Sequence, residues 1–191
     1  AVLKELRPAD SKPIDYLAEL ARQYPELEFV RPAGEAVYRV KGLSGPLILK
    51  RALAHFASKG ALDIDTLGEK NVEALVEVGL VNDLADIYRL TKDDLLQLER
   101  FAEISAQKLI DAIAAKKQPA LERFLFGLGI RHVGAQTAID LANHFESIEK
   151  LSRATIDELR EVDGVGEIVA ESIVAWFADE DNVKLLEKFA D

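Results

Sequence analysis

The sequence of 191 residues contains no cysteine and no methionine, and it has only three histidines. The absence of cysteine excludes disulfide bonds and thiolate metal sites. The histidines, His55, His132 and His144, are too scattered to form a metal site by their spacing. No run approaches the roughly 18 apolar residues that a membrane span needs, and no basic stretch precedes an apolar signal core. We therefore expect a soluble, cytoplasmic protein without metal and without a membrane partner.

Positive charge is also scarce, because 24 lysines and arginines stand against 34 aspartates and glutamates, which gives a net charge of −10. A protein that binds nucleic acid through a broad positive field is expected to be basic. A local cationic strip remains compatible with this balance, and Lys70, Lys108, Arg123, Arg131 and His132 are its candidates. The composition, 49% hydrophobic and 30% charged, is typical of one large or two small globular domains.

A unit of two apolar helices joined by a tight hairpin occurs four times from about residue 61 onward. The hairpins, each with a central apolar residue, are Thr66–Gly68, Arg100–Ala102, His132–Gly134 and Gly164–Gly166. Their closing residues are separated by 34, 32 and 32 residues, and so regular a period indicates duplication of a supersecondary module. Four residues after each closing residue stands a small or slender side chain that would let two helices pack closely: Val72, Ala106, Ala138 and Ala170.

The closing glycines Gly68, Gly134 and Gly166 suit a bend that needs a positive φ and a backbone open to a partner, because glycine has no Cβ. The amides that follow begin a helix, where unpaired N–H groups and the helix dipole attract an anion such as phosphate. A bend of this kind is also an ordinary turn between helices, so one copy leaves both interpretations open. Four copies in phase favour a nucleic-acid module.

We predict that phosphate contacts come from the hairpin glycines, adjacent cationic side chains and polar residues of the following turn: Gly68, Lys70, Arg131, His132, Gly134, Gln136, Thr137, Gly164 and Gly166. A surface salt bridge is the alternative role for Arg131, and a first-turn position without a ligand is the alternative for Gln136 and Thr137. Glu167 opposes phosphate at the fourth hairpin, which therefore binds through amides alone or binds nothing. The second hairpin has no glycine and is expected to be structural.

The pattern as a whole predicts a mainly α protein, a tandem of these helical units preceded by a small subdomain that contains a β-hairpin. Residues 1–8 are expected to form a short strand, and residues 14–24 have the apolar spacing of a helix. Residues 28–41 flank a Pro-Ala-Gly turn with two extended arms. A helix is expected over residues 46–58, and only helices after residue 61.

Helix boundaries are marked by residue type. Thr91 with Asp94, and Thr155 with Glu158, each place a hydroxyl cap three residues before a carboxylate, and this predicts two helix starts. The last segment, residues 180–190, has an apolar face and is expected to close the core.

Several uncommon strings occur in a fixed order along the chain. They are Gly34-Glu35-Ala36-Val37-Tyr38-Arg39, Leu62-Asp63-Ile64-Asp65 before Leu67-Gly68-Glu69-Lys70, Arg123-Phe124-Leu125 before Leu128-Gly129-Ile130-Arg131-His132-Val133-Gly134, and Val165-Gly166. In this order they resemble the C-terminal portion of bacterial NAD-dependent DNA ligases, and the resemblance runs from about Ala1 to Asp191.

In that family an adenylation domain is followed by an OB fold, a four-cysteine zinc finger, a helix-hairpin-helix domain and a BRCT domain. The resemblance implies that residues 1–8 are the remnant of the final OB-fold strand and residues 9–58 a zinc-finger-like region lacking cysteines. Residues 59–191 would then be the helix-hairpin-helix domain with its four repeats. The family seals nicks in DNA during replication and repair.

Two departures from the family qualify this comparison. The zinc ligands are replaced, because Tyr24-Pro25, Val40 and the Gly45-Pro46 region stand where the cysteines are expected, so the family's zinc site is lost. The hairpin must be held by apolar packing, with Tyr24, Phe29 and Val40 as candidates, and the segment either evolved without metal or was engineered free of thiols. The other departure is the second helical hairpin, which has no glycine.

No Lys-x-Asp-Gly string, the family's adenylation motif, occurs in the chain. We therefore predict no catalytic residue and no cofactor in this fragment, NAD being used by the missing catalytic domain, and no activity of the fragment alone. The resemblance implies a monomer that grips double-stranded, nicked DNA through hairpin amides, without reading sequence, as part of an NAD-dependent DNA ligase. A protein-interaction scaffold built on the same repeats is the alternative, and it fits the acidic charge better.

Overall fold

The computed structural model describes residues 15–25, 29–31, 39–40 and 45–190. The chain divides into two compact units, Ala1–Gly45 and Pro46–Asp191. The strand expected over residues 1–8 lies outside the described residues, as does the Pro-Ala-Gly turn.

The first unit contains one helix and one strand pair in its described part. Helix α2 (Tyr16–Gln23) begins where the Asp15 carboxylate accepts hydrogen bonds from two amides of the first turn, each at 3.1 Å. Strands β1 (Phe29–Val30) and β2 (Arg39–Val40) are antiparallel, with Phe29 opposite Val40. The rings of Tyr24 and Phe29 lie 6.2 Å apart. The predicted helix and the antiparallel pairing of the two arms are thus confirmed, and Tyr24 and Phe29, two of the three apolar candidates, contact each other.

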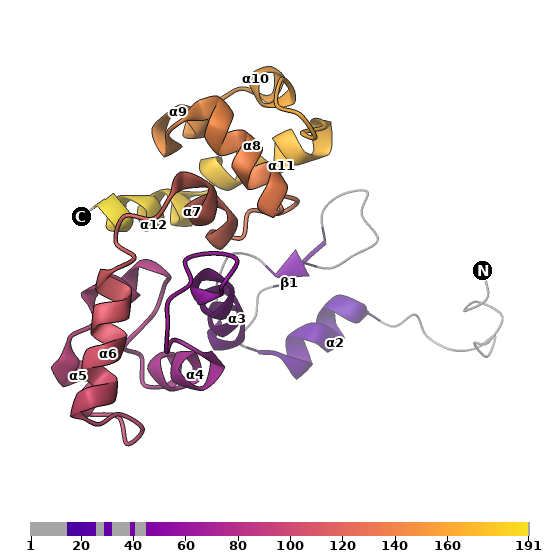
Figure 1. Cartoon of the computed structure of the whole chain (residues 1–191). Coiled ribbons are helices and arrows are strands. Elements are labelled where there is room, and N and C mark those ends of the chain that lie inside the picture. The colour runs from indigo at the N-terminus through magenta and orange to yellow at the C-terminus, as the bar shows by residue number, and fades with distance from the viewer. Residues whose placement is uncertain (1–14, 26–28, 32–38, 41–44, 191) are drawn as a thin grey trace, which may run out of the picture. The chain divides into compact units, whose positions relative to one another are not determined.

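The second unit is helical (Figure 1). Its elements are α3 (Pro46–Ala57), α4 (Glu69–Glu77), the 3₁₀ helix η1 (Ala85–Arg89), α5 (Lys92–Leu96), α6 (Glu103–Ala114), α7 (Leu121–Gly127), α8 (Ala135–Phe145), α9 (Ile148–Ser152), α10 (Ile156–Arg160), α11 (Glu167–Ala178) and α12 (Glu180–Ala190). Both predicted hydroxyl caps are present, because Thr91 and Thr155 form capping boxes at the starts of α5 and α10. The prediction of a mainly α fold is confirmed.

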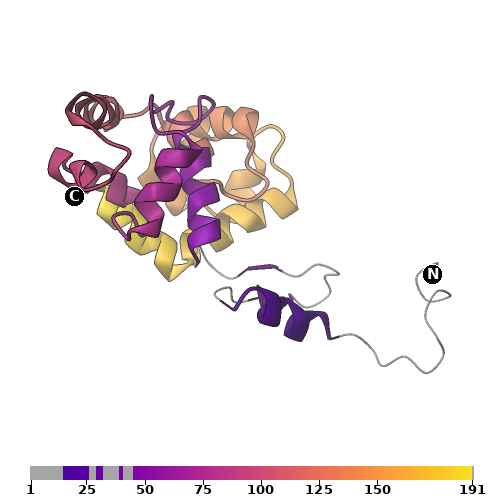
Figure 2. The ribbon, with the colours of Figure 1, turned by 90° about the horizontal axis from the view of Figure 1, so that it is seen from below.

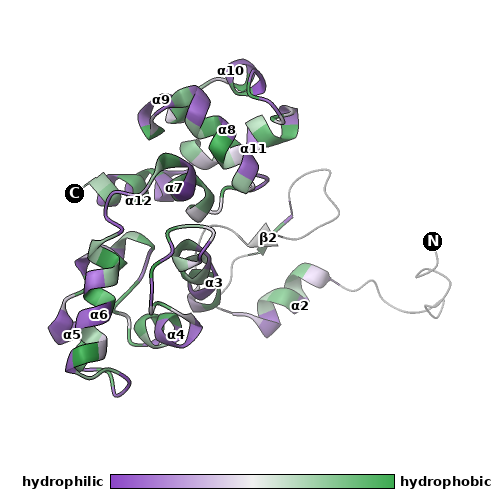
Figure 3. Cartoon of the chain, in the orientation of Figure 1, coloured by the Kyte–Doolittle hydropathy of each residue, from purple (hydrophilic) through white to green (hydrophobic). Residues whose placement is uncertain are grey.

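Two hydrophobic clusters divide the second unit. One is formed mainly by the first half (residues 46–114), among α3, α4, η1, α5 and α6, with Leu185 added from α12, and the other lies within the second half (residues 121–178), among α7 to α11. Figure 3 shows apolar and polar stretches alternating along these helices. Each half thus buries its own pair of repeats, as expected if the first and second repeats, and the third and fourth, form paired units.

Helix α12 belongs to both halves. Its Leu185 is buried in the first cluster, whereas Phe189 packs against both clusters together with Phe124 and Phe126 of α7. Figures 1 and 2 show α12, drawn in yellow, extending back toward the magenta helices of the first half. The expectation that the last segment closes the core is therefore confirmed.

Helix α3 packs with the helical repeats, so the compact helical unit starts earlier than residue 59. The sequence comparison assigned residues 9–58 to the zinc-finger-like region, but the compact helical unit begins at Pro46. The reason is that Leu49, Leu53 and Phe56 share one face of α3 and are buried in the first cluster. The core of the first half could not be complete without them.

Arg123 of α7 links the two halves through hydrogen bonds. It does not belong to a cationic strip, contrary to our expectation. Its guanidinium donates hydrogen bonds to the carbonyl oxygens of Ala61, at 2.5 Å, and Lys59, at 3.2 Å. Nearby, His55 Nε2 lies 2.7 Å from the carbonyl oxygen of Phe126. Both contacts join the first half to α7, so the charge of Arg123 is used inside the fold.

A second fastening joins α12 to the first half. The Lys188 ammonium contacts the carboxylates of Asp83 and Asp86, the latter at 2.8 Å. Burial raises the pKa of Asp86, but the hydrogen bonds from Lys188 and from the amides of Asn82 and Asp83 outweigh it and hold that pKa below its ordinary value. The carboxylate therefore stays charged and paired at neutral pH.

Candidate nucleic-acid interface

The four helical hairpins share one pattern of burial. The central residue of each is buried, and the residues on either side of it are exposed. The central residues are Leu67, Phe101, Val133 and Val165. The side chains four residues after the closing positions are all fully or almost fully buried: Val72, Ala106, Ala138 and Ala170. The packing role predicted for these small residues is confirmed, and the bends themselves face solvent.

The backbone corrects the reason given for the closing glycines. Positive φ values occur at the first hairpin position, at Thr66 (66°), His132 (65°) and Gly164 (74°). The closing glycines Gly68, Gly134 and Gly166 are extended, with φ of −83° in each case, a conformation that any residue adopts. A need for positive φ therefore explains Gly164 but none of the closing glycines.

Packing does not explain the closing glycines either. A Cβ built on Gly68, Gly134 or Gly166 would meet no atom within 4 Å. The second hairpin already has such a Cβ, because Ala102 occupies the equivalent position with an extended backbone (φ −113°, ψ 169°). Since neither conformation nor space in the described structure requires glycine, the bare backbone at these three hairpins is suited to close approach from outside.

The helices that follow these three glycines begin without a side-chain cap. None of Gly68, Gly134 and Gly166, the N-cap residues of α4, α8 and α11, is bridged by a side chain of the first turn. Their first amides therefore point outward with the positive end of the helix dipole, which is the arrangement that binds a phosphate or another anion.

In the second hairpin a side chain caps the backbone amide of Ala102. The hydroxyl of Ser105 accepts a hydrogen bond from the Ala102 amide at 2.9 Å and donates one to the Ala102 carbonyl at 3.0 Å. Sequence reasoning missed this role of Ser105, although a hydroxyl three residues after the closing position is a recognisable signal. The hairpin that has no glycine thus also offers one outward amide fewer, which agrees with the prediction that it is structural.

The third hairpin has the electrostatics best suited to an anion. Arg131 and His132 are exposed beside it, and neither forms an ion pair within the described residues. The first residue of α8 is Ala135, whereas α4, α6 and α11 each begin with a glutamate. A carboxylate at that position stabilises the free helix but repels a phosphate. The third hairpin alone of the four avoids this conflict.

Two of the side chains predicted to contact phosphate at the third hairpin are less available than expected. The Gln136 side-chain amide donates a hydrogen bond to the Asp140 carboxylate at 3.0 Å, so it is already engaged within α8. Thr137 is half-buried in the first turn. The backbone amides of this turn, with Gly134, are therefore better candidates for the contact than these two side chains.

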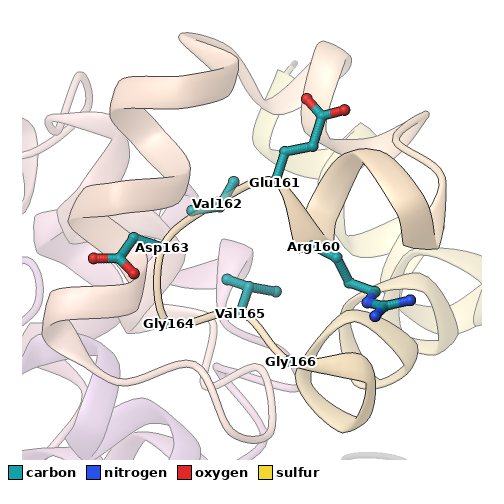
Figure 4. A pocket seen from close by; sticks show the side chains of 7 residues that line it. All are labelled: Arg160, Glu161, Val162, Asp163, Gly164, Val165 and Gly166. Carbon is teal, nitrogen blue, oxygen red and sulfur yellow. The ribbon is translucent and has the colours of Figure 1, made fainter.

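The first and fourth hairpins are less favourable for an anion, because the helices that follow them begin with Glu69 and Glu167. Each nevertheless has a feature that suits a phosphate. At the first, Lys70 is exposed in the first turn of α4, two residues after Gly68. At the fourth, an open hollow of about 520 Å³ is lined by Arg160, Glu161, Val162, Asp163, Gly164, Val165 and Gly166 (Figure 4). The carboxylates of Glu161 and Asp163 extend away from the bare Gly164–Gly166 backbone.

The nine predicted residues thus fall on three hairpins. Five of them share the third hairpin and its following turn, two lie at the first and two at the fourth. Within the described ranges no helix has the length and hydrophobicity to cross a membrane. In the same part of the chain, no three histidine, aspartate or glutamate side chains gather where they could hold a metal ion.

Comparison with protein-family models finds the same motif in each half. Residues 59–115 match the model described as a SAM-like helix-hairpin-helix tandem, and residues 123–186 match the model described as a helix-hairpin-helix motif. The first match contains the first two hairpins and the second contains the last two. The two matches correspond to the two hydrophobic clusters.

Curated relatives extend the comparison. The chain is 45% identical over 166 residues to proteins named DNA ligase from Bacillus cereus (strain AH187), Bacillus thuringiensis (strain Al Hakam) and Bacillus anthracis (strain A0248). Each alignment covers 87% of this chain but only 25% of the relative, so the chain spans about a quarter of the length of the proteins it matches. The resemblance indicated by the sequence is confirmed: this is a tandem helix-hairpin-helix chain that is similar to one part of bacterial DNA ligases.

Proposed function

We propose that this chain binds double-stranded DNA without reading its sequence, as the DNA-gripping part of an NAD-dependent DNA ligase. Amides at the first, third and fourth hairpins donate hydrogen bonds to backbone phosphates, and the third hairpin makes the strongest contact. Contacts to phosphate alone give an affinity that does not depend on sequence, and an enzyme that closes breaks anywhere in DNA needs such an affinity. The chain works as a monomer in the cytoplasm, and its preferred substrate is nicked duplex.

The observation that carries this proposal is the bare backbone at the three closing glycines. Gly68, Gly134 and Gly166 are followed by uncapped helix amides, and no neighbouring atom would meet a Cβ there. The net charge of −10 argues against a broad electrostatic surface, so the affinity has to come from these few local sites. Weak binding with a small salt dependence follows from that distribution.

The test is a titration of the chain against nicked and intact duplex of one sequence at two salt concentrations. Gly134→Val places a branched side chain over the third site, and Arg131→Ala removes its exposed cation. We expect both to weaken binding, Gly134→Val by about tenfold or more, because one phosphate contact is lost. The salt slope of the parent should correspond to only a few phosphates, and that of Arg131→Ala should be smaller by about one.

Ala102→Val is the matched control, because it makes a comparable change at the equivalent position of the self-capped hairpin. It should weaken binding much less than Gly134→Val does, because this hairpin is poorly suited to grip a phosphate. Circular dichroism should show the same helix content in all variants, since the extended backbone at residue 134 accepts valine. Equal binding by the parent, Gly134→Val and Arg131→Ala would contradict the proposal and favour the protein-scaffold alternative.

A further inference from the structure

Two isoleucines stand out on the surface of the second unit. Ile104 is 73% exposed and Ile168 is 68% exposed, and these are the two most exposed large apolar side chains among the described residues. A single exposed isoleucine needs no explanation. These two, however, occupy the same position in two different repeats, two residues after the closing residues Ala102 and Gly166.

The equivalent positions of the other two repeats are polar. Lys70 stands there in the first repeat and Gln136 in the third, and both are exposed. Each half of the unit therefore pairs one hairpin that has a polar side chain at this position with one that has an isoleucine. Polar and apolar side chains thus alternate at this position over the four repeats. Such an alternation indicates that the two isoleucines share a role that differs from that of Lys70 and Gln136.

The position lies in the first turn of a helix, next to the outward amides. Ile104 is the second residue of α6 and Ile168 the second residue of α11. A duplex whose phosphates meet the hairpin amides would bring its sugars against these side chains, because each phosphate is joined directly to a deoxyribose. The apolar face of that sugar is the part of the DNA backbone with which an isoleucine can pack favourably.

We infer that Ile104 and Ile168 pack against deoxyribose in the groove of the bound duplex and make binding selective for deoxyribose over ribose. This inference rests on the proposed DNA binding and deepens it. A ribose would place its 2′-hydroxyl against the isoleucine, where the hydroxyl loses water and gains no hydrogen-bond partner. The hairpin amides see phosphate in either nucleic acid and do not distinguish them.

This role also accounts for the second hairpin. Its amide is closed by Ser105 and its closing residue is alanine, so it is poorly suited to grip a phosphate. Ile104 gives it an apolar contact in place of that grip. The charge beside Ile104 is compatible with this apolar contact. Glu103, directly before it, is paired with Lys92 and so presents less uncompensated negative charge to the DNA.

The experiment uses the double variant Ile104→Ser/Ile168→Ser of the whole chain. Two probes of one sequence are compared, an all-DNA duplex and the same duplex with single ribonucleotides spaced along both strands. The parent should prefer the all-DNA duplex by about tenfold, the effect of leaving a buried hydroxyl unpaired. In the variant the preference should fall to near one, and affinity for the all-DNA duplex should fall on the order of fivefold or more. The salt slope should not change, because no charge is altered.

Val78→Ser is the matched control, since Val78 is 56% exposed but lies at the C-terminal end of α4, away from its hairpin. It should bind both probes like the parent, as should Ile104→Val/Ile168→Val, which keeps an apolar side chain. A parent that binds DNA, with a serine variant of unchanged affinity and sugar preference, would overturn this inference and leave the proposed function standing. A parent that binds neither probe would overturn both.

Discussion

The two halves of the helical unit are built from the same motif pair, yet they present different surfaces. In the second half both hairpins close with glycine, and the third has Arg131 and His132 beside it. In the first half one hairpin closes with glycine and the other closes on itself through Ser105. The buried parts are nevertheless alike, since each repeat buries its central hairpin residue and the small residue that follows it.

The difference shows which features the fold requires and which it leaves free. The hairpin of Ala102 keeps its shape with a Cβ and with a capped amide, so the fold requires neither glycine nor an open amide. The features common to all four repeats serve the core. The bare, uncapped backbone confined to the first, third and fourth hairpins is the feature we connect with phosphate binding.

The largest effect is expected where the halves are alike. Ala106→Leu in the first half and Ala138→Leu in the second each force a larger side chain into a fully buried position between helices. Each should lower the free energy of unfolding by about 2–3 kcal/mol, because an overpacked core shifts backbone and rotamers. Denaturant titration followed by circular dichroism measures this. A loss in one variant only would show that the repeats do not share a packing role.

A smaller effect is expected at the fastening between the halves. Asp86→Asn should lower the free energy of unfolding by about 1 kcal/mol at pH 7, a partly exposed pair being worth little more. Because the folded pKa of Asp86 is lowered, its contribution is present above the unfolded value near 3.9 and is lost as the pH falls through the folded value.

The stabilities of parent and Asp86→Asn should therefore converge as the pH falls from about 5 to 2. Lys150→Ala is the control for a surface ion pair, since Lys150 and Glu146 are both well exposed, and it should change little at any pH. A difference between parent and Asp86→Asn that persisted at pH 2 would have to come from something other than the charge of Asp86.

The smallest effect separates the second hairpin from the third. Ser105→Ala should lower the free energy of unfolding by about 0.5–1 kcal/mol, because the Ala102 amide loses its partner. Thr137→Ala, at the equivalent position after Gly134, should cost less, since no side chain caps that helix. Thermal unfolding of both variants measures the contrast, and equal losses would show that the third hairpin is capped as well.

Much of this fold could be predicted from the sequence, because its signals are local. The spacing of small residues located the helix pairs, and Thr91 and Thr155 marked helix starts that the structure has. The burial of Ala106 and Ala138 followed from the period alone. Such features depend on residues a few positions apart, which a repeat makes visible several times.

The features that the sequence did not predict depend mostly on contacts between distant segments. Arg123 was placed in a cationic strip, but it donates to carbonyls some sixty residues earlier, and nothing local in the sequence signals such a contact. The sequence also did not signal that the compact helical unit starts at Pro46, because Leu53 and Phe56 join the core of repeats that lie later in the chain. The backbone conformation of the closing glycines also had to be seen, since extended and left-handed bends share one sequence pattern.

Helix α12 has a consequence for how the chain is made. Phe189 stacks on Phe56 with ring centroids 5.6 Å apart and lies 6.0 Å from the ring of Tyr88, so residues near the two ends of the helical unit meet in one core. On a ribosome that adds about 5–20 residues per second, Phe189 is synthesised on the order of several seconds after the first half of the helical unit. During that interval the rings of Phe56 and Tyr88 lack this partner, and termination before Phe189 would leave that part of the core unfilled.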